Sequence, residues 1–128
     1  MSYYYPAHVE LLTTATTNKA VPICFHERVE IVGVKIVDGA GIAEHSSNYV
    51  TFEVLGNDKT VTLFKWETKT GEQGALTANV SGDLVSQNES AKAIFDAGIP
   101  VIVKVTHAGS GKATDASICL QLRQARAY

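Results

Sequence analysis

The alternation of apolar and polar positions along the chain predicts an all-β protein. The clearest segment is 48–55, NYVTFEVL. Its residues Val50, Phe52 and Val54 share one face of an extended strand, while the intervening side chains occupy the other face. A Gly-Asn-Asp-Lys turn follows, so the next alternating run, 60–66, is expected to fold back on this strand as a hairpin. We expect Phe52, in the middle of the apolar face, to lie in the core.

Further runs have the apolar and β-branched content of strands: 21–25, 29–37, 76–85, 99–107 and 114–124. In 29–37 the apolar positions change parity beside Gly33, which predicts a β-bulge. Pro22 indicates an edge strand or the start of a strand, because proline lacks the N–H donor of a sheet ladder. Residues 88–98 are the only helical candidate, and a loop with one helical turn is the alternative.

About seven strand-like runs separated by Gly, Asn, Asp and Ser turns are typical of a sandwich. The sequence therefore predicts a single-domain antiparallel β-sandwich or jelly roll over residues 21–128. Residues 1–20 show no clear period, and two interpretations stand: a frayed terminus, or an extended arm that packs on another molecule. We predict the arm, which could then be removed without destabilising the domain. Its expected interaction residues are Tyr3, Tyr4, Tyr5, Val9, Leu11 and Leu12.

Composition and charge narrow the class of protein. Hydrophobic residues make up 45% of the chain and charged residues 19%, which argues against disorder. The net charge of −2 comes from scattered residues, so no basic footprint for nucleic acid or an anionic membrane is expected. The N-terminus has no signal-peptide pattern, and no run approaches the roughly 18 apolar residues of a membrane span. We therefore expect synthesis in the cytoplasm.

The two cysteines, Cys24 and Cys119, lie in predicted strands and are interpreted as reduced core residues. A disulfide remains open if the two strands are neighbours. Cys119 shares its strand face with Gln121 and Arg123, opposite the apolar face of 114–124.

The Gly-Ser-Gly-Lys segment at 109–112 invites comparison with a phosphate-binding loop. That motif requires a glycine where this chain has Thr106 and a hydroxyl residue where it has Ala113. The segment that follows alternates with the period of a strand, whereas the motif must open a helix. We therefore predict a turn between two antiparallel strands and no nucleotide site.

Other candidate chemistry is sparse. The four histidines do not have metal-ligand spacing: His8, His26, His45 and His107. Cys24 and His26 could share a strand face, but no oxyanion hole is evident beside them. The carboxylates lie at turns or on polar faces, and Trp66 is interpreted as a core residue, with a sugar-stacking platform as the alternative. No catalytic, cofactor-binding or metal residues are assigned, and we predict that the protein is not an enzyme.

Three stretches carry a resemblance to a known family: VEIVGVKIVDGAGIAEHSSNYVTFEVL, LFKWETKTGEQGALTANV and AKAIFDAGIPVIVKVTHAGSGKATDASICLQL. With these, the chain resembles the small β-sandwich head decoration, or cement, proteins of tailed bacteriophages over about residues 29–122. The family pattern has an aspartate after Ala-Gly in the late strand, whereas this chain has Ile99 and Pro100. The start of that strand is therefore reshaped here.

This resemblance implies a structural virion protein on the outer capsid surface that stabilises the capsid by bridging its subunits. The partners it implies are the major capsid protein and other copies of the chain, and we favour a trimer over a dimer. A carbohydrate-binding or tail-associated adhesion module is the alternative. That alternative requires an exposed aromatic platform, for example Trp66 with Tyr49.

Overall fold

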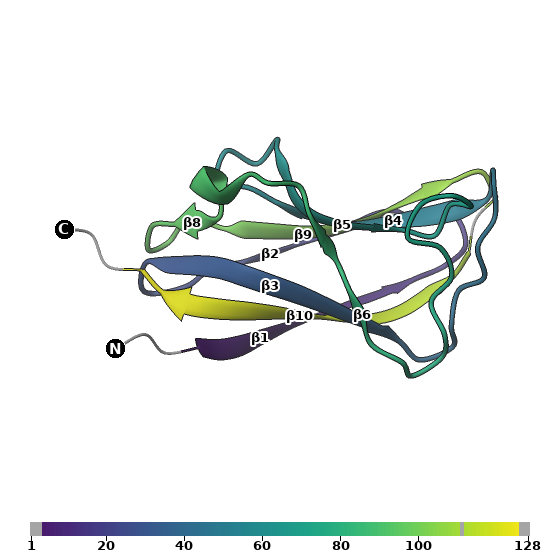
Figure 1. The fold of residues 1–128 in the computed structure, drawn as a ribbon, viewed down its shortest axis with the longest axis horizontal. Coiled ribbons are helices and arrows are strands. Elements are labelled where there is room, and N and C mark those ends of the chain that lie inside the picture. The colour runs from purple at the N-terminus through teal and green to yellow at the C-terminus, as the bar shows by residue number, and fades with distance from the viewer. Residues whose placement is uncertain (1–3, 111, 126–128) are drawn as a thin grey trace.

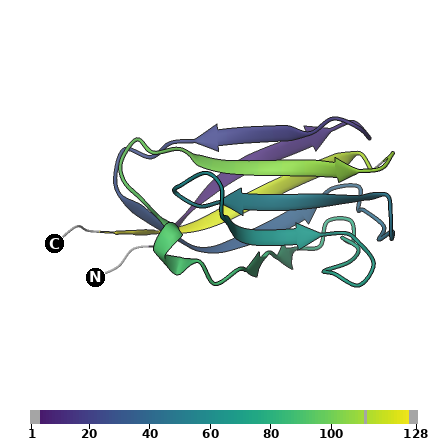
Figure 2. The ribbon, with the colours of Figure 1, turned by 90° about the horizontal axis from the view of Figure 1, so that it is seen from above.

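The protein is a sandwich of two antiparallel β-sheets, which confirms the predicted all-β class (Figure 1). The structure, a computed structural model, describes residues 4–110 and 112–125. Figure 2 looks down on one sheet, with the strands of the other sheet behind it. In the described part of the chain, no helix has the length and apolarity that a membrane crossing needs.

The long strands carry most of the fold, and the segment 82–95 contributes three two-residue strands and one 3₁₀ turn. The elements in chain order are β1 (Tyr4–Thr13), β2 (Lys19–Ile23), β3 (Val29–Asp38), β4 (Tyr49–Leu55), β5 (Thr62–Glu67), β6 (Gly82–Asp83), β7 (Val85–Ser86), η1 (Ser90–Lys92), β8 (Ile94–Phe95), β9 (Val101–Ala108) and β10 (Thr114–Gln124).

The strand order is that of a jelly roll. One sheet has the order β1-β10-β3-β6, with β8 also paired to β3, and the other has the order β2-β9-β4-β5-β7. When β6 and β8 are counted together as the sixth strand, and β7 as a short extension beside β5, the sheets read first-eighth-third-sixth and second-seventh-fourth-fifth. In this count of eight, successive strands alternate between the sheets, except for the β4–β5 hairpin. This is the double Greek key that defines the jelly roll.

The core lies between the sheets and follows the predicted strand faces. Val50, Phe52 and Val54 are fully buried, as the alternation of 48–55 predicts. The predicted bulge in β3 is confirmed. Gly33 pairs with Gln121, whereas the next partner, Leu122, pairs with Ile31, so one extra β3 residue lies between them.

The N-terminal segment is a strand of the sandwich, so the predicted arm is wrong for residues 4–13. β1 pairs with β10 along all ten of its residues, at the edge of its sheet. Val9 and Leu11 point into the core with 5% and 0% of their surface exposed. The alternation was hidden because the outward positions include Pro6 and Leu12, which are apolar too. Residues 19–23 likewise form the edge strand β2, which places Pro22 at an edge as predicted.

The segment around 109–112 leads into a strand, as predicted, but it does not form a hairpin. β9 pairs with β2 and β4 in one sheet, and β10 pairs with β1 and β3 in the other. The connection therefore crosses from one layer to the other. Gly109 has φ of 68° and packs against Ser47 and Asn48, so a side chain at this position would be strained and would lack space.

Two further expectations are resolved by the structure. Residues 88–98 form no full helix: they contain the single 3₁₀ turn η1, close to the predicted alternative of one helical turn, followed by the short strand β8. Both cysteines are free, but neither lies in the core: Cys24 is exposed after β2, and Cys119 is half-buried on the outward face of β10. The prediction that both cysteines are core residues is therefore wrong. In β10, Cys119 alternates in step with Gln121 and Arg123 and points outward with them.

Candidate interaction surface

Within residues 4–110 and 112–125, no group of three or more His, Cys, Asp or Glu side chains is placed to hold a metal ion. The thiol of Cys24 lies 3.9 Å from the carbonyl oxygen of Gly98, a weak contact in an exposed loop. The surfaces of the two sheets therefore offer the best candidates for a functional site.

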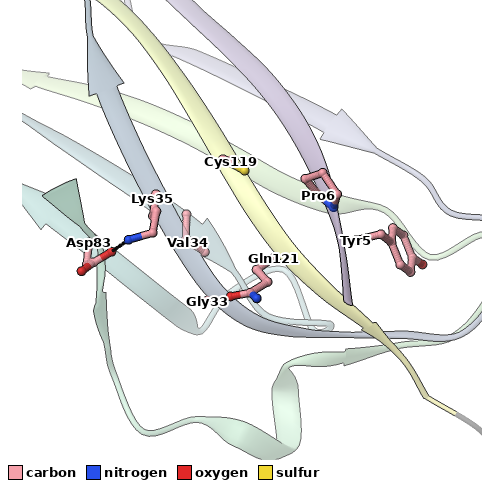
Figure 3. A pocket seen from close by; sticks show the side chains of 8 residues that line it. All are labelled: Tyr5, Pro6, Gly33, Val34, Lys35, Asp83, Cys119 and Gln121. Atoms are coloured by element: carbon pink, nitrogen blue, oxygen red, sulfur yellow. Dashed lines mark hydrogen bonds and ion pairs between the residues drawn. The ribbon is translucent and has the colours of Figure 1, made fainter. Parts of the chain in front are cut away.

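The outer face of the β1-β10-β3-β6 sheet is hollowed (Figure 3). The hollow has a volume of about 430 Å³ and draws on all four strands. Its depth has a local cause, since Gly33 presents no side chain at the bulge of β3 and the amide of Gln121 lies over it. The other outward residues that form it include Pro6 of β1, Cys119 of β10, Lys35 of β3 and Asp83 of β6.

One wall of the hollow is an ion pair. Lys35 and Asp83 are direct partners in the β3–β6 ladder, and Lys35 Nζ lies 2.6 Å from Asp83 Oδ1 (Figure 3). Both side chains are more than half exposed, so this pair contributes little to stability. It does hold the lysine at the rim, which leaves the floor of the hollow uncharged.

The outer face of the opposite sheet carries charged side chains of both signs. Glu53 of β4 lies directly across from Lys104 of β9 and Lys65 of β5, and its carboxylate also accepts a hydrogen bond from the Thr62 hydroxyl. Lys65 Nζ in turn lies 3.5 Å from Glu67 Oε2. These charges compensate one another across neighbouring strands, as on a solvated sheet face. Surfaces that bind proteins are depleted in charge at their centre, and the lining of the hollow is uncharged apart from Lys35 and Asp83, so the hollow is the better candidate.

The structure separates the predicted arm residues into three groups. Val9 and Leu11 are buried inside the sandwich and are not available to a partner. Leu12 points outward from β1 with 67% of its surface exposed, and Tyr5 is half-buried at the start of the strand. Tyr4 lies in β1, and Tyr3 lies outside the described residues.

The start of β1 is held by a polar cluster centred on Glu27. The Tyr5 hydroxyl donates to Glu27 Oε1 at 3.0 Å, and the Gln124 amide donates to Glu27 Oε2 at 2.9 Å. Burial, followed by the hydrogen bond to the Glu27 carboxylate and its negative charge, raises the pKa of Tyr5 from about 10 to about 12. The cluster therefore links the first and last strands to the loop before β3.

The raised pKa of Tyr5 predicts that the folded protein loses stability at alkaline pH. Between about pH 10 and pH 12 the unfolded chain releases the Tyr5 proton while the folded chain keeps it, so stability falls as the pH rises. Tyr5→Phe removes this contribution, and its stability should decline less steeply over that interval. Urea unfolding at several pH values measures the difference. Identical slopes for the two proteins would contradict the assignment.

Trp66 and Tyr49 do not form the aromatic platform suggested for the carbohydrate-binding alternative. Trp66 pairs with Phe52 and turns inward, where its ring packs on Gly82 and its indole N–H donates to the Gly74 carbonyl at 3.0 Å. Tyr49 lies on the outward face of β4, with Lys69 Nζ 5.4 Å from its ring centroid. The two rings therefore lie on opposite faces of the sheet.

Sequence reasoning identified part of the candidate surface and missed the rest. The outward direction of Cys119, Gln121 and Arg123 follows from the alternation of 114–124. The hollow itself was not predicted, although the parity change beside Gly33 was its signal. A bulge glycine on an outward face leaves a gap, but its depth depends on which strand lies beside it.

No protein-family model and no curated protein matches the sequence. Solved structures similar to the chain include one from Desmodium yellow mottle tymovirus, at 10% identity and a TM-score of 0.47, covering 97% of this chain and 80% of the other. A chain of turnip yellow mosaic virus has 9% identity and a TM-score of 0.48, with coverage of 97% and 92%. The VP2 chain of an infectious bursal disease virus subviral particle has 15% identity and a TM-score of 0.38, with coverage of 96% and 33%.

Proposed function

We propose that the chain is a structural subunit of a bacteriophage virion. In this role it binds the outside of the capsid and stabilises the shell by bridging capsid subunits. The observation that carries the proposal is the hollow in the outer face of the β1-β10-β3-β6 sheet, whose lining residues are uncharged apart from the Lys35–Asp83 pair at its rim. The resemblance of residues 29–122 to phage decoration proteins supports the same role, and the jelly-roll order agrees with the architecture that this resemblance implies.

The surface suits a partner that is already folded. A volume of about 430 Å³ accepts one or two apolar or aromatic side chains of a capsid loop, and such anchors supply most of the energy of an interface. The Gln121 amide over the floor offers both a donor and an acceptor to the main chain of that loop. Lys35 and Asp83 at the rim would then set its orientation. The major capsid protein is the partner we propose.

Filling the hollow tests this function. Cys119→Tyr places a ring in it from an outward position, and we expect particle binding to weaken by about tenfold or more because the anchor is displaced. The melting temperature should stay close to that of the parent protein, since Cys119 does not belong to the buried core. A titration of the variant onto capsids that lack the protein measures the effect.

Thr106→Tyr is the matched control, because it adds the same ring to an outward position of β9 on the opposite sheet. It should bind particles as the parent protein does. If Cys119→Tyr binds normally, the hollow is not the capsid contact. If Thr106→Tyr alone loses binding, the contact lies on the other face.

A further inference from the structure

β1 presents a long unpaired edge. It is the outermost strand of its sheet, it pairs with β10 over all ten residues without a register shift, and within the described chain no strand pairs with its other side. Its neighbour at that border, β2, belongs to the opposite sheet. An unpaired edge of this length is a template for pairing with another strand.

The direction of the free backbone groups follows from a side-chain contact. The Thr114 hydroxyl, on β10, donates to the carbonyl oxygen of Leu11 at 2.8 Å, so the polar groups of Leu11 are directed toward β10. Backbone polar groups alternate in direction along a strand, so those of His8, Glu10 and Leu12 face the free edge. Pro6 has the same parity, and proline is tolerated in an edge strand where the N–H position faces away from the sheet.

We propose that two copies of the chain join through antiparallel pairing of β1 with β1 of the second copy, in a register centred on Val9. In this register His8 lies opposite Glu10 of the second copy, and Pro6 lies opposite its Leu12. Each of these pairs occurs twice across a two-fold axis, as an isologous interface requires. The contact forms about six backbone hydrogen bonds, because each Pro6 lacks one donor.

Side-chain chemistry selects this register over its neighbours. His8, Glu10, Pro6 and Leu12 all lie on the exposed outer face of β1. A shift of the centre to Glu10 would place the two Glu10 carboxylates opposite each other, and like charges in directly opposed positions are destabilising. A shift to His8 would place Glu10 against the Pro6 ring. The register centred on Val9 lets imidazole donate to carboxylate and covers Leu12, which is otherwise 67% exposed.

The pairing has a consequence for the larger surface. The two-fold axis runs perpendicular to the sheet, so the two sheets become continuous and their hollows open on the same side. The pairing does not depend on the proposed function, but a dimer of this form would present two capsid contacts to one shell. A two-fold contact produces a dimer, in place of the trimer that the sequence analysis favoured.

A charge exchange tests the register in the full-length protein. Glu10→Lys should raise the dissociation constant of the dimer by about tenfold or more, because it places lysine opposite His8. His8→Glu should do the same, because it places a second carboxylate opposite Glu10. The double variant, His8→Glu with Glu10→Lys, restores opposite charges and should return the constant to within about threefold of the parent value. Sedimentation velocity over a range of concentrations measures all four proteins.

Glu72→Lys is the matched control, because it makes the same charge change at an exposed loop position and should leave the dimer unchanged. Glu10→Pro is a second test that does not rely on charge. It removes a donor at the free edge and leaves the β10 ladder intact, so the dimer should weaken while the far-ultraviolet spectrum stays that of the parent. A parent protein that is monomeric at roughly 100 µM would overturn the proposal. An oligomer that is indifferent to both single charge changes would overturn it as well.

Discussion

Phe52→Ala is expected to lower the free energy of unfolding by about 3–5 kcal/mol, the range for truncating a buried phenylalanine. Phe52 is fully buried in the centre of β4, with Val105 of β9 and Trp66 of β5 as its direct partners on the two sides. Three strands therefore meet around its ring, and relaxation of one strand does not close the cavity. Such a loss is a large fraction of the stability of a small domain. Urea denaturation followed by circular dichroism measures it.

Thr51→Ala, the neighbouring residue on the outward face of β4, is the control and should change stability by less than about 1 kcal/mol. The comparison tests whether the sheet is buried on one side. Equal losses for Phe52→Ala and Thr51→Ala would mean that the outer face of β4 is also covered within the isolated protein.

Leu11→Ala is the second large effect, at about 2–5 kcal/mol. Leu11 is fully buried, and its carbonyl accepts the Thr114 hydroxyl, which itself lies 2.7 Å from the Thr13 hydroxyl. Truncation opens a cavity beside this buried polar pair, where a poor fit is costly. The same denaturation experiment, carried out at low protein concentration to keep the chain monomeric, measures the change.

Leu12→Ala removes the same atoms one residue further along and should leave the stability of the monomer nearly unchanged, since Leu12 is exposed. Comparison of Leu11→Ala with Leu12→Ala tests whether residues 4–13 form a strand of the sandwich or a separate arm. Similar small losses at both positions would mean that residues 4–13 do not belong to the sandwich in solution.

The sequence by itself was enough to predict those strands that have one face in the core and the other in solvent. In 48–55 the inward positions are apolar and the outward ones are mostly polar, so the period of two is visible without knowledge of any partner. The bulge at Gly33 was likewise visible as a change of parity within one strand. The outward direction of Gln121 followed in the same way. These features depend on the alternation of apolar and polar residues within one strand, which can be read directly from the sequence.

The hollow depended on tertiary structure. Gly33 and Gln121 are far apart in the chain and become neighbours when β3 pairs with β10. A missing side chain forms a depression where the adjacent strands also present outward residues, such as Pro6 and Cys119, around it. A local sequence pattern does not show which strands are neighbours in a sheet. The sequence therefore predicted which residues point outward, but not that they come together to form the hollow.

The first strand and the last connection were also decided by tertiary structure alone. Residues 4–13 show no clean period because Pro6 and Leu12 place apolar groups on the outward face, and the segment becomes a strand by pairing with β10 at the other end of the chain. The two strands that flank 109–112 predict a hairpin there, yet those strands belong to different sheets. In a jelly roll, strands that are distant in sequence pair and successive strands often do not. Pairing between such distant strands is stabilised when the two sheets bury their apolar faces against each other. That burial depends on the whole fold, so the sequence of one segment does not reveal it.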